Sequence, residues 1–398
     1  MRGLLRCDTA AITPGQFMNI SSWNGRFPRN EIISLLDVTR THNLAESTSI
    51  NLTFGDLLDL GDLEKLRTLS LGYGSAQGSL TLREAIGAAC GTSPDNVLTT
   101  QGAALALFLL AFEVCGRGAD VVLATPCFPP SRDTLLACGA HIHAVPLNFD
   151  DGYRLDVGKI SSRLTPATRL VSIASPQNPS GVRVSEGEIH ELLHQMQDRS
   201  PQALLFVDET YREAAYGDEP VPASVAGLDA RIVTGASVSK ALGAPGLRVG
   251  WLTVPDAALR ERLTIAKMNL TVSGSPLDET LATLLIEHRQ AILAPRRRML
   301  AQALETIRSW LYKESRRLEW VAPQGGALCC MRLRQNVFDA AAISDFWCSL
   351  ERHDLQLAPG DWFGEEACVF RLGFGFLPID RLPFALEAVT RALNYVTP

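Results

Sequence analysis

The stretch of sequence that decides the fold runs Ser237-Val238-Ser239-Lys240-Ala241-Leu242-Gly243-Ala244-Pro245-Gly246-Leu247-Arg248-Val249-Gly250-Trp251. Two hydroxyl residues precede Lys240, three glycines follow it, and an arginine stands eight positions on. This context suits a lysine that forms a Schiff base beside a phosphate, because glycines permit tight turns and Arg248, Ser237 and Ser239 can donate to phosphate oxygens. A surface lysine after a serine turn is common for S-x-S-K alone, but it is rare for the whole run.

The whole run resembles the pyridoxal-phosphate signature of the class I and II aminotransferases, in which the matching lysine forms the Schiff base with the cofactor. The resemblance implies that Lys240 carries pyridoxal 5'-phosphate and that Ser237, Ser239 and Arg248 bind its phosphate. It also implies an α/β protein of fold type I, with a mostly parallel central sheet between helices in a large domain and a smaller α/β domain. We expect the large cofactor-binding domain at 46–285, and the small domain with the N-terminal segment at 1–45 and 286–398.

Hydrophobic patterning predicts a similar α/β architecture. From about Asn96 to Val254, β-branched apolar runs alternate with amphipathic stretches, as in a βαβ sheet covered on both faces. We expect strands at 121–124, 142–145, 170–174, 204–207, 231–234 and 248–254, and helices at 103–114, 131–137 and 186–197. After Pro276, a strongly helical stretch to about Trp310 leads to residues 318–398, which we interpret as strand, helix, strand, strand, helix.

Upstream of Lys240, the segment Phe206-Val207-Asp208-Glu209-Thr210-Tyr211 resembles the family's strand-end D-x-x-Y. The resemblance implies that Asp208 keeps the pyridine nitrogen protonated, so that the ring accepts electrons released at the substrate Cα. It also implies that Tyr211 and Asn178 bind the ring oxygen O3′. Taken alone, Asp208 can be a helix N-cap and Asn178 a turn residue, but their order and spacing, 30 positions apart and then 32 to Lys240, favour function.

Two segments match family positions around the cofactor. Gly102-Ala103-Ala104 precedes an apolar helix whose free N–H groups can hold an anion, and it resembles the first phosphate-binding loop. Alanines replace the hydroxyl and the acid that are frequent there, so we expect backbone amides to make the contacts. Phe128 occupies the position of the aromatic residue that stacks on the cofactor ring, and a purely core phenylalanine is the alternative.

Two more segments concern the substrate and a second subunit. Val369-Phe370-Arg371-Leu372-Gly373-Phe374-Gly375 resembles the family's R-[LI]-[GS]-F segment, in which the arginine binds the substrate α-carboxylate. A structural salt bridge is the alternative for Arg371. Tyr73, in Leu71-Gly72-Tyr73-Gly74, matches a tyrosine that reaches the neighbouring subunit's site, which implies a homodimer.

The motifs imply that a free L-amino acid displaces Lys240, which then removes its Cα proton together with Asp208 and Tyr211 as catalytic partners. They do not decide the fate of the resulting carbanion. Thr53-Phe54-Gly55-Asp56-Leu57 stands where ordinary transaminases have a glycine followed by an acid-Pro pair that lines the pocket. It resembles the T-F-G-[DE]-L stretch of capreomycidine synthases, which cyclise a hydroxyarginine, so Thr53 is expected beside the substrate. We also expect Asn178 beside the substrate.

Our leading expectation is therefore β- or γ-elimination, replacement or cyclisation of the side chain in secondary metabolism, including use of a γ-leaving group such as S-adenosylmethionine. The alternative is ordinary transfer of the amino group to a 2-oxo acid. A cofactor-sensing transcription regulator would need a winged-helix domain ahead of the motifs, whereas only about 50 residues precede them.

Composition sets the remaining expectations. The 398 residues are 46% hydrophobic and 20% charged with a net charge of −6, which is typical of a globular protein and argues against nucleic acid as the main partner. The longest apolar run, 103–112, is shorter than the ~20 residues of a bilayer span, and Met1 to Ala10 lacks the apolar core of a signal peptide. We therefore expect no membrane association and a cytoplasmic location. The nine scattered cysteines, without C-x-x-C, predict reduced thiols and no metal.

Overall fold

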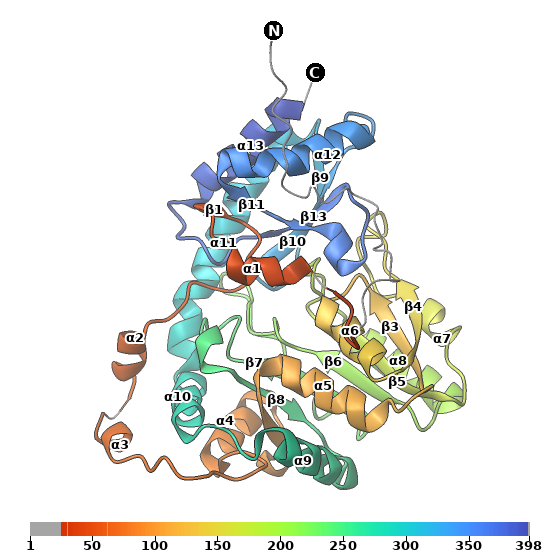
Figure 1. The fold of residues 1–398 in the computed structure, drawn as a ribbon, viewed down its shortest axis with the longest axis vertical. Helices are drawn as coiled ribbons and strands as arrows, with labels where there is room; N and C mark the ends of the chain where they lie inside the picture. Colours follow the sequence, from red (N-terminus) through yellow and green to blue (C-terminus); the bar gives the residue numbers. More distant parts are fainter. Residues whose placement is uncertain (1–24, 30, 62, 397–398) are drawn as a thin grey trace.

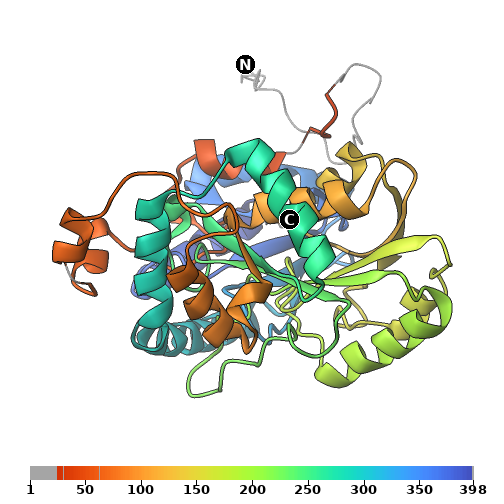
Figure 2. The same cartoon turned by 90° about the horizontal axis from the view of Figure 1, so that it is seen from below.

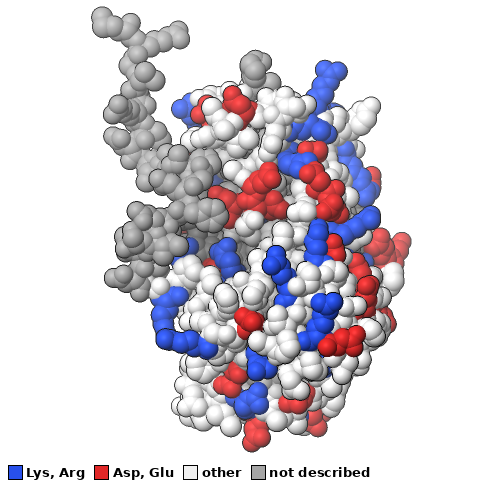
Figure 3. Space-filling model, turned by 90° about the vertical axis from the view of Figure 1, so that its right-hand side faces the viewer, with Lys and Arg blue, Asp and Glu red and all other residues white. Residues whose placement is uncertain are grey.

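The computed structural model describes residues 25–29, 31–61 and 63–396, and Figure 1 shows two β-sheets with their covering helices. The N-terminal residues that bear on a signal peptide lie outside this described part. Among the described residues, no helix is both long and apolar enough to cross a membrane. On the face shown in Figure 3, basic and acidic side chains are interspersed rather than gathered by sign.

The large sheet has seven strands in the order β2-β8-β7-β6-β5-β3-β4. All neighbouring pairs are parallel except those of β8, which is antiparallel to both β2 and β7. The mostly parallel α/β sheet that we expected is confirmed, and all six predicted strands are present. β2 was not predicted, because its Val-Leu-Thr-Thr-Gln is short and half polar. The strands are β2 (Val97–Gln101), β3 (Asp120–Thr125), β4 (His141–Pro146), β5 (Thr168–Ala174), β6 (Leu204–Asp208), β7 (Ile232–Ser237) and β8 (Val249–Thr253).

Helices cover both faces of this sheet, because alternate residues of each strand point to opposite sides. Val121 and Phe206 pack with one set of helices, and their neighbours Val122 and Leu205 pack with the other. Figure 2 shows the same layering from below, with the yellow-green α8 and the teal-green α9 on opposite sides of the strands. The first set is α5 (Gly102–Val114), α6 (Pro129–Ala137) and α9 (Ala257–Thr271); the second includes α4 (Leu80–Cys90), α7 (Val157–Ser161), α8 (Glu186–Arg199) and α10 (Pro276–Glu287).

The helical stretch expected from Pro276 to about Trp310 is two helices. α10 ends at Glu287, and α11 runs over Arg289–Glu314. His288 separates them because its ψ of 12° departs from the α-helical value.

The small sheet is antiparallel, in the order β12-β13-β10-β9. Its strands are β9 (Leu318–Val321), β10 (Leu328–Leu333), β12 (Ala358–Pro359) and β13 (Val369–Gly373), and β1 (His42–Asn43) pairs separately with β11 (Leu355–Gln356). The expected order of strand, helix, strand, strand, helix was wrong, because β9 and β10 both precede the helix α12.

The remaining helices are α12 (Ala340–Ser349), α13 (Leu382–Val396) and the short α1 (Ser34–Asp37), α2 (Phe54–Leu58) and α3 (Leu63–Arg67), of which α2 and α3 project from the body in Figure 1. Five 3-10 turns complete the described elements: 31–33, 94–96, 245–247, 350–353 and 360–363.

The segment that follows β1 joins the small sheet to the lysine motif. Leu44 exchanges backbone hydrogen bonds with Gln356 and Gly373, and the N–H of Ser49 donates to the carbonyl of Lys240 at 3.2 Å. Residues between these anchors therefore lie beside the carboxyl end of the large sheet, where ligand crevices of open α/β sheets form. The large sheet falls within 46–285 and the small sheet within 286–398, but the domain division itself stays a prediction.

Cysteines within the described residues are all free thiols, as expected. Six are buried and therefore pack as core side chains: Cys90, Cys115, Cys127, Cys329, Cys330 and Cys368. Cys138 is half-buried and Cys348 is exposed, so not every thiol is a core residue.

Candidate active site

Lys240 follows β7 and meets two residues from the segment after β1. Its Nζ lies 3.6 Å from Glu46 Oε1 and makes a long contact of 3.4 Å with Ser47 Oγ. It also lies over the ring of Tyr211, 5.9 Å from the centroid. Ser47 shares a 2.8 Å hydrogen bond with the Tyr211 hydroxyl, so one serine contacts both the lysine and the tyrosine.

Glu46 is held as an ionised carboxylate. Its Oε1 accepts backbone hydrogen bonds from Ser47 at 2.8 Å and Thr48 at 3.2 Å. Burial by itself raises the pKa of Glu46, but the charges of Lys240 and Arg371 and these two hydrogen bonds outweigh it, so the pKa lies below the ordinary glutamate value. Neither Glu46 nor Ser47 was predicted from the sequence. They lie in a short polar run that follows no periodic pattern and meets Lys240 only through tertiary folding.

Asp208 is the last residue of β6, as the motif predicted. Its Oδ1 accepts a 2.9 Å hydrogen bond from the N–H of Thr210. Burial raises the pKa of Asp208, and the hydrogen bonds of Thr210 and the charge of Lys240 only partly oppose this rise. Among the described residues, no cation forms an ion pair with Asp208. A buried carboxylate of this kind gains from a protonated ligand nitrogen placed against it.

A cavity beside Asp208 collects several of the predicted residues. Its lining includes Phe128, Asn178, Asp208 and Tyr211. Phe128 is the residue immediately before α6, and its half-buried ring also packs against the α5 side of the core. The Phe128 ring can therefore contact a ligand in the cavity while it also packs against core side chains.

Arg371 lies in β13 and is fully buried. Its Nη1 donates to Asn178 Oδ1 at 3.0 Å, its Nη2 donates to the carbonyl of Ala45 at 2.6 Å, and its guanidinium stacks 4.7 Å from the Phe363 ring. Its Nε is buried with no hydrogen-bond partner in the described structure. Within the described residues Arg371 forms no ion pair with a carboxylate, so the salt-bridge alternative lacks a partner. The charge of Glu46 acts on Arg371 without bonding to it, and the unpartnered Nε of this buried guanidinium can still be met by an anionic ligand.

Two glycines form a cradle at the start of α5. Gly102 has φ +74°, and a Cβ there would lie 2.4 Å from Arg248 Nη2. A Cβ on Gly250 would lie 2.6 Å from the backbone N of Ala103. Only glycines therefore let Arg248 and β8 approach the free N–H groups of Ala103 and Ala104 in the first helical turn.

The serines of the lysine motif lie at the end of β7, with Ser237 its last residue and Ser239 in the turn that follows. The N–H of Ser239 donates to Ser237 Oγ at 3.3 Å, and Ser239 is buried. Arg248 follows with a left-handed φ of 51° and an exposed side chain that donates to the carbonyl of Pro245 at 3.0 Å. The donors of the motif thus remain available to an anion.

Two predicted residues lie apart from this group within the chain. Tyr73 precedes α4 and is 89% exposed. Thr53 caps the projecting helix α2, where its hydroxyl accepts from the N–H of Asp56 at 3.2 Å and donates to the Asp56 carboxylate at 2.7 Å. This capping box explains why Thr53 turns toward its own helix. The structure therefore does not place either residue beside Lys240 of the same chain.

Comparisons with known proteins identify the family. Residues 58–376 match the family model for aminotransferase class I and II. Capreomycidine synthase of Streptomyces vinaceus is 34% identical over 88% of this chain and 90% of its own length. An arginine–pyruvate transaminase of Pseudomonas aeruginosa is 26% identical over 74% of this chain and 75% of its own. The solved structure of a PLP-dependent cyclase, OrfR, superposes with a TM-score of 0.82 at 25% identity, covering 94% of this chain and 99% of that one.

Proposed function

The chain belongs to the aminotransferase class I and II family, and we propose that it removes the Cα proton of a free L-amino acid and then eliminates, replaces or cyclises the side chain. Pyridoxal phosphate is the cofactor, and the fold is that of fold-type-I enzymes. Members of the family act on small amino acids. Beyond this family assignment, we propose which reaction follows removal of the Cα proton and which substrate side chain the site accepts.

Two observations fit the cofactor to the site. The glycine cradle beside Arg248 leaves room for a phosphate at the start of α5, and buried Asp208 lacks a cationic partner in the described structure. When bound, the cofactor supplies an electron sink for the electrons released at the substrate Cα. We assign its aldehyde to Lys240, its ring to Asp208, Tyr211, Asn178 and Phe128, and its phosphate to Gly102, Ala103, Ala104, Ser237, Ser239 and Arg248.

The remaining residues place the substrate. Arg371 receives the α-carboxylate through its planar donor fork, and Asn178 holds the guanidinium in position by accepting a hydrogen bond from Nη1. Once Lys240 is released by the substrate amine, its Nζ is the base for the Cα proton. Ser47 and Tyr211 orient this amine through their shared hydrogen bond.

Glu46 is the observation that carries the choice of substrate. Amino transfer requires a base, a carboxylate-binding cation and the cofactor, and all three are assigned without it. An ionised carboxylate 3.6 Å from the lysine adds a group that binds a cationic side chain or stabilises the lysine while it carries a proton. Two relatives are named for capreomycidine and for arginine, which supports an arginine-type side chain. We therefore propose a substrate with a guanidinium group.

These residues account for every proton in a cyclisation. Lys240 takes the Cα proton and becomes an ammonium that Glu46 stabilises. A side-chain hydroxyl departs with its bonding electrons and takes this proton, leaving as water. A nitrogen of the guanidinium bonds to the vacated carbon and loses a proton to Lys240, which returns a proton to Cα. One water leaves and no oxidant or reductant is needed.

Ordinary amino transfer is the second candidate. The family match and the relative named as a transaminase favour it, as does the D-x-x-Y arrangement of Asp208 and Tyr211. The two are separated by mass analysis of the products from a panel of amino acids, with and without an added 2-oxo acid. Side-chain chemistry predicts repeated turnover without a 2-oxo acid, whereas amino transfer predicts at most one product per active site until a 2-oxo acid is added.

We also propose a homodimer in which Tyr73 reaches the neighbouring site. Tyr73 and Leu71 are 89% and 79% exposed, and further apolar side chains are exposed on and after α9: Ile265, Met268, Leu270 and Val272. Exposed apolar side chains in such numbers are typical of a surface that another chain covers. The projecting position of Thr53 on α2 is also compatible with a role beside the partner's substrate.

A further inference from the structure

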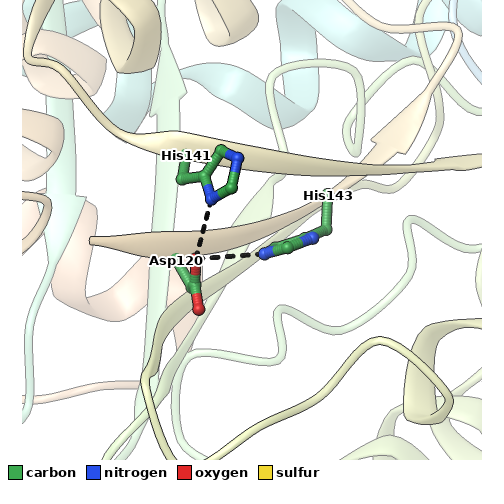
Figure 4. A group of neighbouring side chains, drawn as sticks. All are labelled: Asp120, His141 and His143. Atoms are coloured by element: carbon green, nitrogen blue, oxygen red, sulfur yellow. Dashed lines mark hydrogen bonds and ion pairs between the residues drawn. The ribbon is translucent and has the colours of Figure 1, made fainter. Parts of the chain in front are cut away.

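Asp120, His141 and His143 form a cluster at the end of the large sheet opposite to the active site. Asp120 begins β3, and it pairs with His141 at the start of the edge strand β4. His143 lies two residues further along β4 and therefore on the same face. Figure 4 shows both imidazoles turned toward the Asp120 carboxylate. Lys240 and Asp208 follow the carboxyl ends of their strands, so the two sites are separate.

The three possible ligand atoms lie close enough together to share one metal ion. Asp120 Oδ1 lies 3.3 Å from His141 Nδ1 and 3.0 Å from His143 Nε2, and the three ligand atoms all lie within 4.8 Å of one another. With metal–ligand bonds of about 2.0–2.2 Å, neighbouring ligand atoms of a tetrahedron are roughly 3.3–3.5 Å apart. Binding a metal here also requires the ring nitrogens of His141 and His143 that face Asp120 to give up the protons they donate to the carboxylate.

The donor set selects the class of metal. Two imidazoles and one carboxylate suit Zn²⁺ and its late divalent neighbours rather than Ca²⁺ or Mg²⁺, which prefer oxygen ligands alone. The His141 side chain is 74% exposed, so an ion can enter from solvent.

We propose that Asp120, His141 and His143 bind one Zn²⁺ ion, with water in the fourth position, and that the ion fastens the edge strand β4 to β3. Its ligands come from two neighbouring strands, so binding adds a cross-link between β3 and the edge strand β4. An ion that binds only the folded chain raises the thermal midpoint, and the midpoint goes on rising with the logarithm of the ion concentration above the dissociation constant. The proposal does not depend on the reaction at Lys240.

The test is a titration of untagged, metal-stripped holoenzyme with Zn²⁺ alone, followed by calorimetry and thermal unfolding. We expect one ion per chain with micromolar affinity and a midpoint that rises with Zn²⁺ concentration. His141→Asn with His143→Asn should weaken binding at least tenfold and abolish the rise, whereas catalytic activity without metal stays unchanged. Co²⁺ in place of Zn²⁺ should give the intense visible absorption of a tetrahedral site.

The chain offers a matched control on α8, where His190 and His194 lie one helical turn apart and each pairs with a carboxylate. Replacing both with Asn should leave affinity and midpoint unchanged. Loss of binding in this variant, or equal binding by the His141 and His143 double variant and the wild type, would overturn the proposal. Binding without any rise in the midpoint would overturn the fastening role.

Discussion

The Glu46 carboxylate lies 3.6 Å from the Lys240 amine, although the two residues are far apart in the sequence. The backbone holds this pair in place. The N–H of Ser49 donates to the carbonyl of Lys240, and Ser47 and Thr48 donate to the carboxylate. An acid and a base are thereby fixed together beside the arginine proposed for the substrate carboxylate.

Replacing Glu46 tests its proposed role in recognising a cationic side chain. Glu46→Gln should weaken binding of L-arginine by about 1.5–3 kcal/mol, the range for a hydrogen bond to a charged group. Binding of L-citrulline, which has nearly the same shape without the charge, should change little. Spectral titration of the holoenzyme measures both affinities. Glu46→Asp, which keeps the charge, serves as the control, and equal losses for both ligands would remove Glu46 from side-chain recognition.

Asp208→Asn separates a catalytic acid from a structural cap. Because burial raises the folded-state pKa of Asp208, this group stabilises the fold below its ordinary pKa of 3.8, and that contribution is lost as pH rises through the folded value. The asparagine amide does not ionise, so the variant avoids the cost of burying a charged carboxylate. The apoprotein variant should therefore be more stable than the wild type at neutral pH. Turnover of the loaded enzyme should fall by orders of magnitude.

Urea unfolding of the apoprotein and steady-state kinetics of the holoenzyme provide the two readouts for Asp208→Asn. A merely structural cap predicts the opposite pair of results. The variant would then be less stable, since the hydrogen bond to Thr210 is weakened, and its turnover would stay close to that of the wild type.

Arg371→Ala should weaken amino-acid binding by about 2–5 kcal/mol, the usual effect of removing one partner of a buried charge pair. The cofactor spectrum should not change. Agmatine, which lacks the α-carboxylate of arginine, provides the matched ligand and should bind the variant and the wild type alike. If agmatine and L-arginine lose equal affinity, Arg371 does not receive the carboxylate.

Tyr73 is expected to act in the partner's site, which a mixing experiment tests. Chains carrying Lys240→Ala and chains carrying Tyr73→Ala should each have little activity, whereas hybrid dimers should regain roughly one intact site per dimer. Activity is measured after refolding the two chains together. No recovery, with hybrids shown to form, or a monomer in sedimentation would exclude this arrangement.

The sequence predicted the parts of the site that have local signatures. Asp208 and Ser237 end strands, and Gly102 begins a helix, so patterning and motif order located them. The structure brings Asn178, Asp208 and Tyr211 to one cavity and Lys240 onto the Tyr211 ring. Their roles toward cofactor and substrate stay predictions.

Features that depend on long-range contacts were not predicted. Glu46 and Ser47 acquire their contacts only because β1 pairs with β11 and leads the chain back toward Lys240. Thr53 was expected in the pocket from a short motif, but its hydroxyl is hydrogen-bonded to Asp56 in the capping box of α2. The strands β11 and β12 have two residues each. Two residues are too few to show the alternation of apolar and polar side chains that predicts a strand.

The most direct test of the proposed reaction is a single-turnover spectrum of the holoenzyme with excess β-hydroxylated L-arginine and no 2-oxo acid. If side-chain cyclisation is the function, the absorbance of the lysine-bound cofactor should return at the end of the turnover, and the product mass should be that of the substrate less one water. Lasting conversion of the cofactor to its amine form, reversed only by adding a 2-oxo acid, would contradict the account and establish amino transfer.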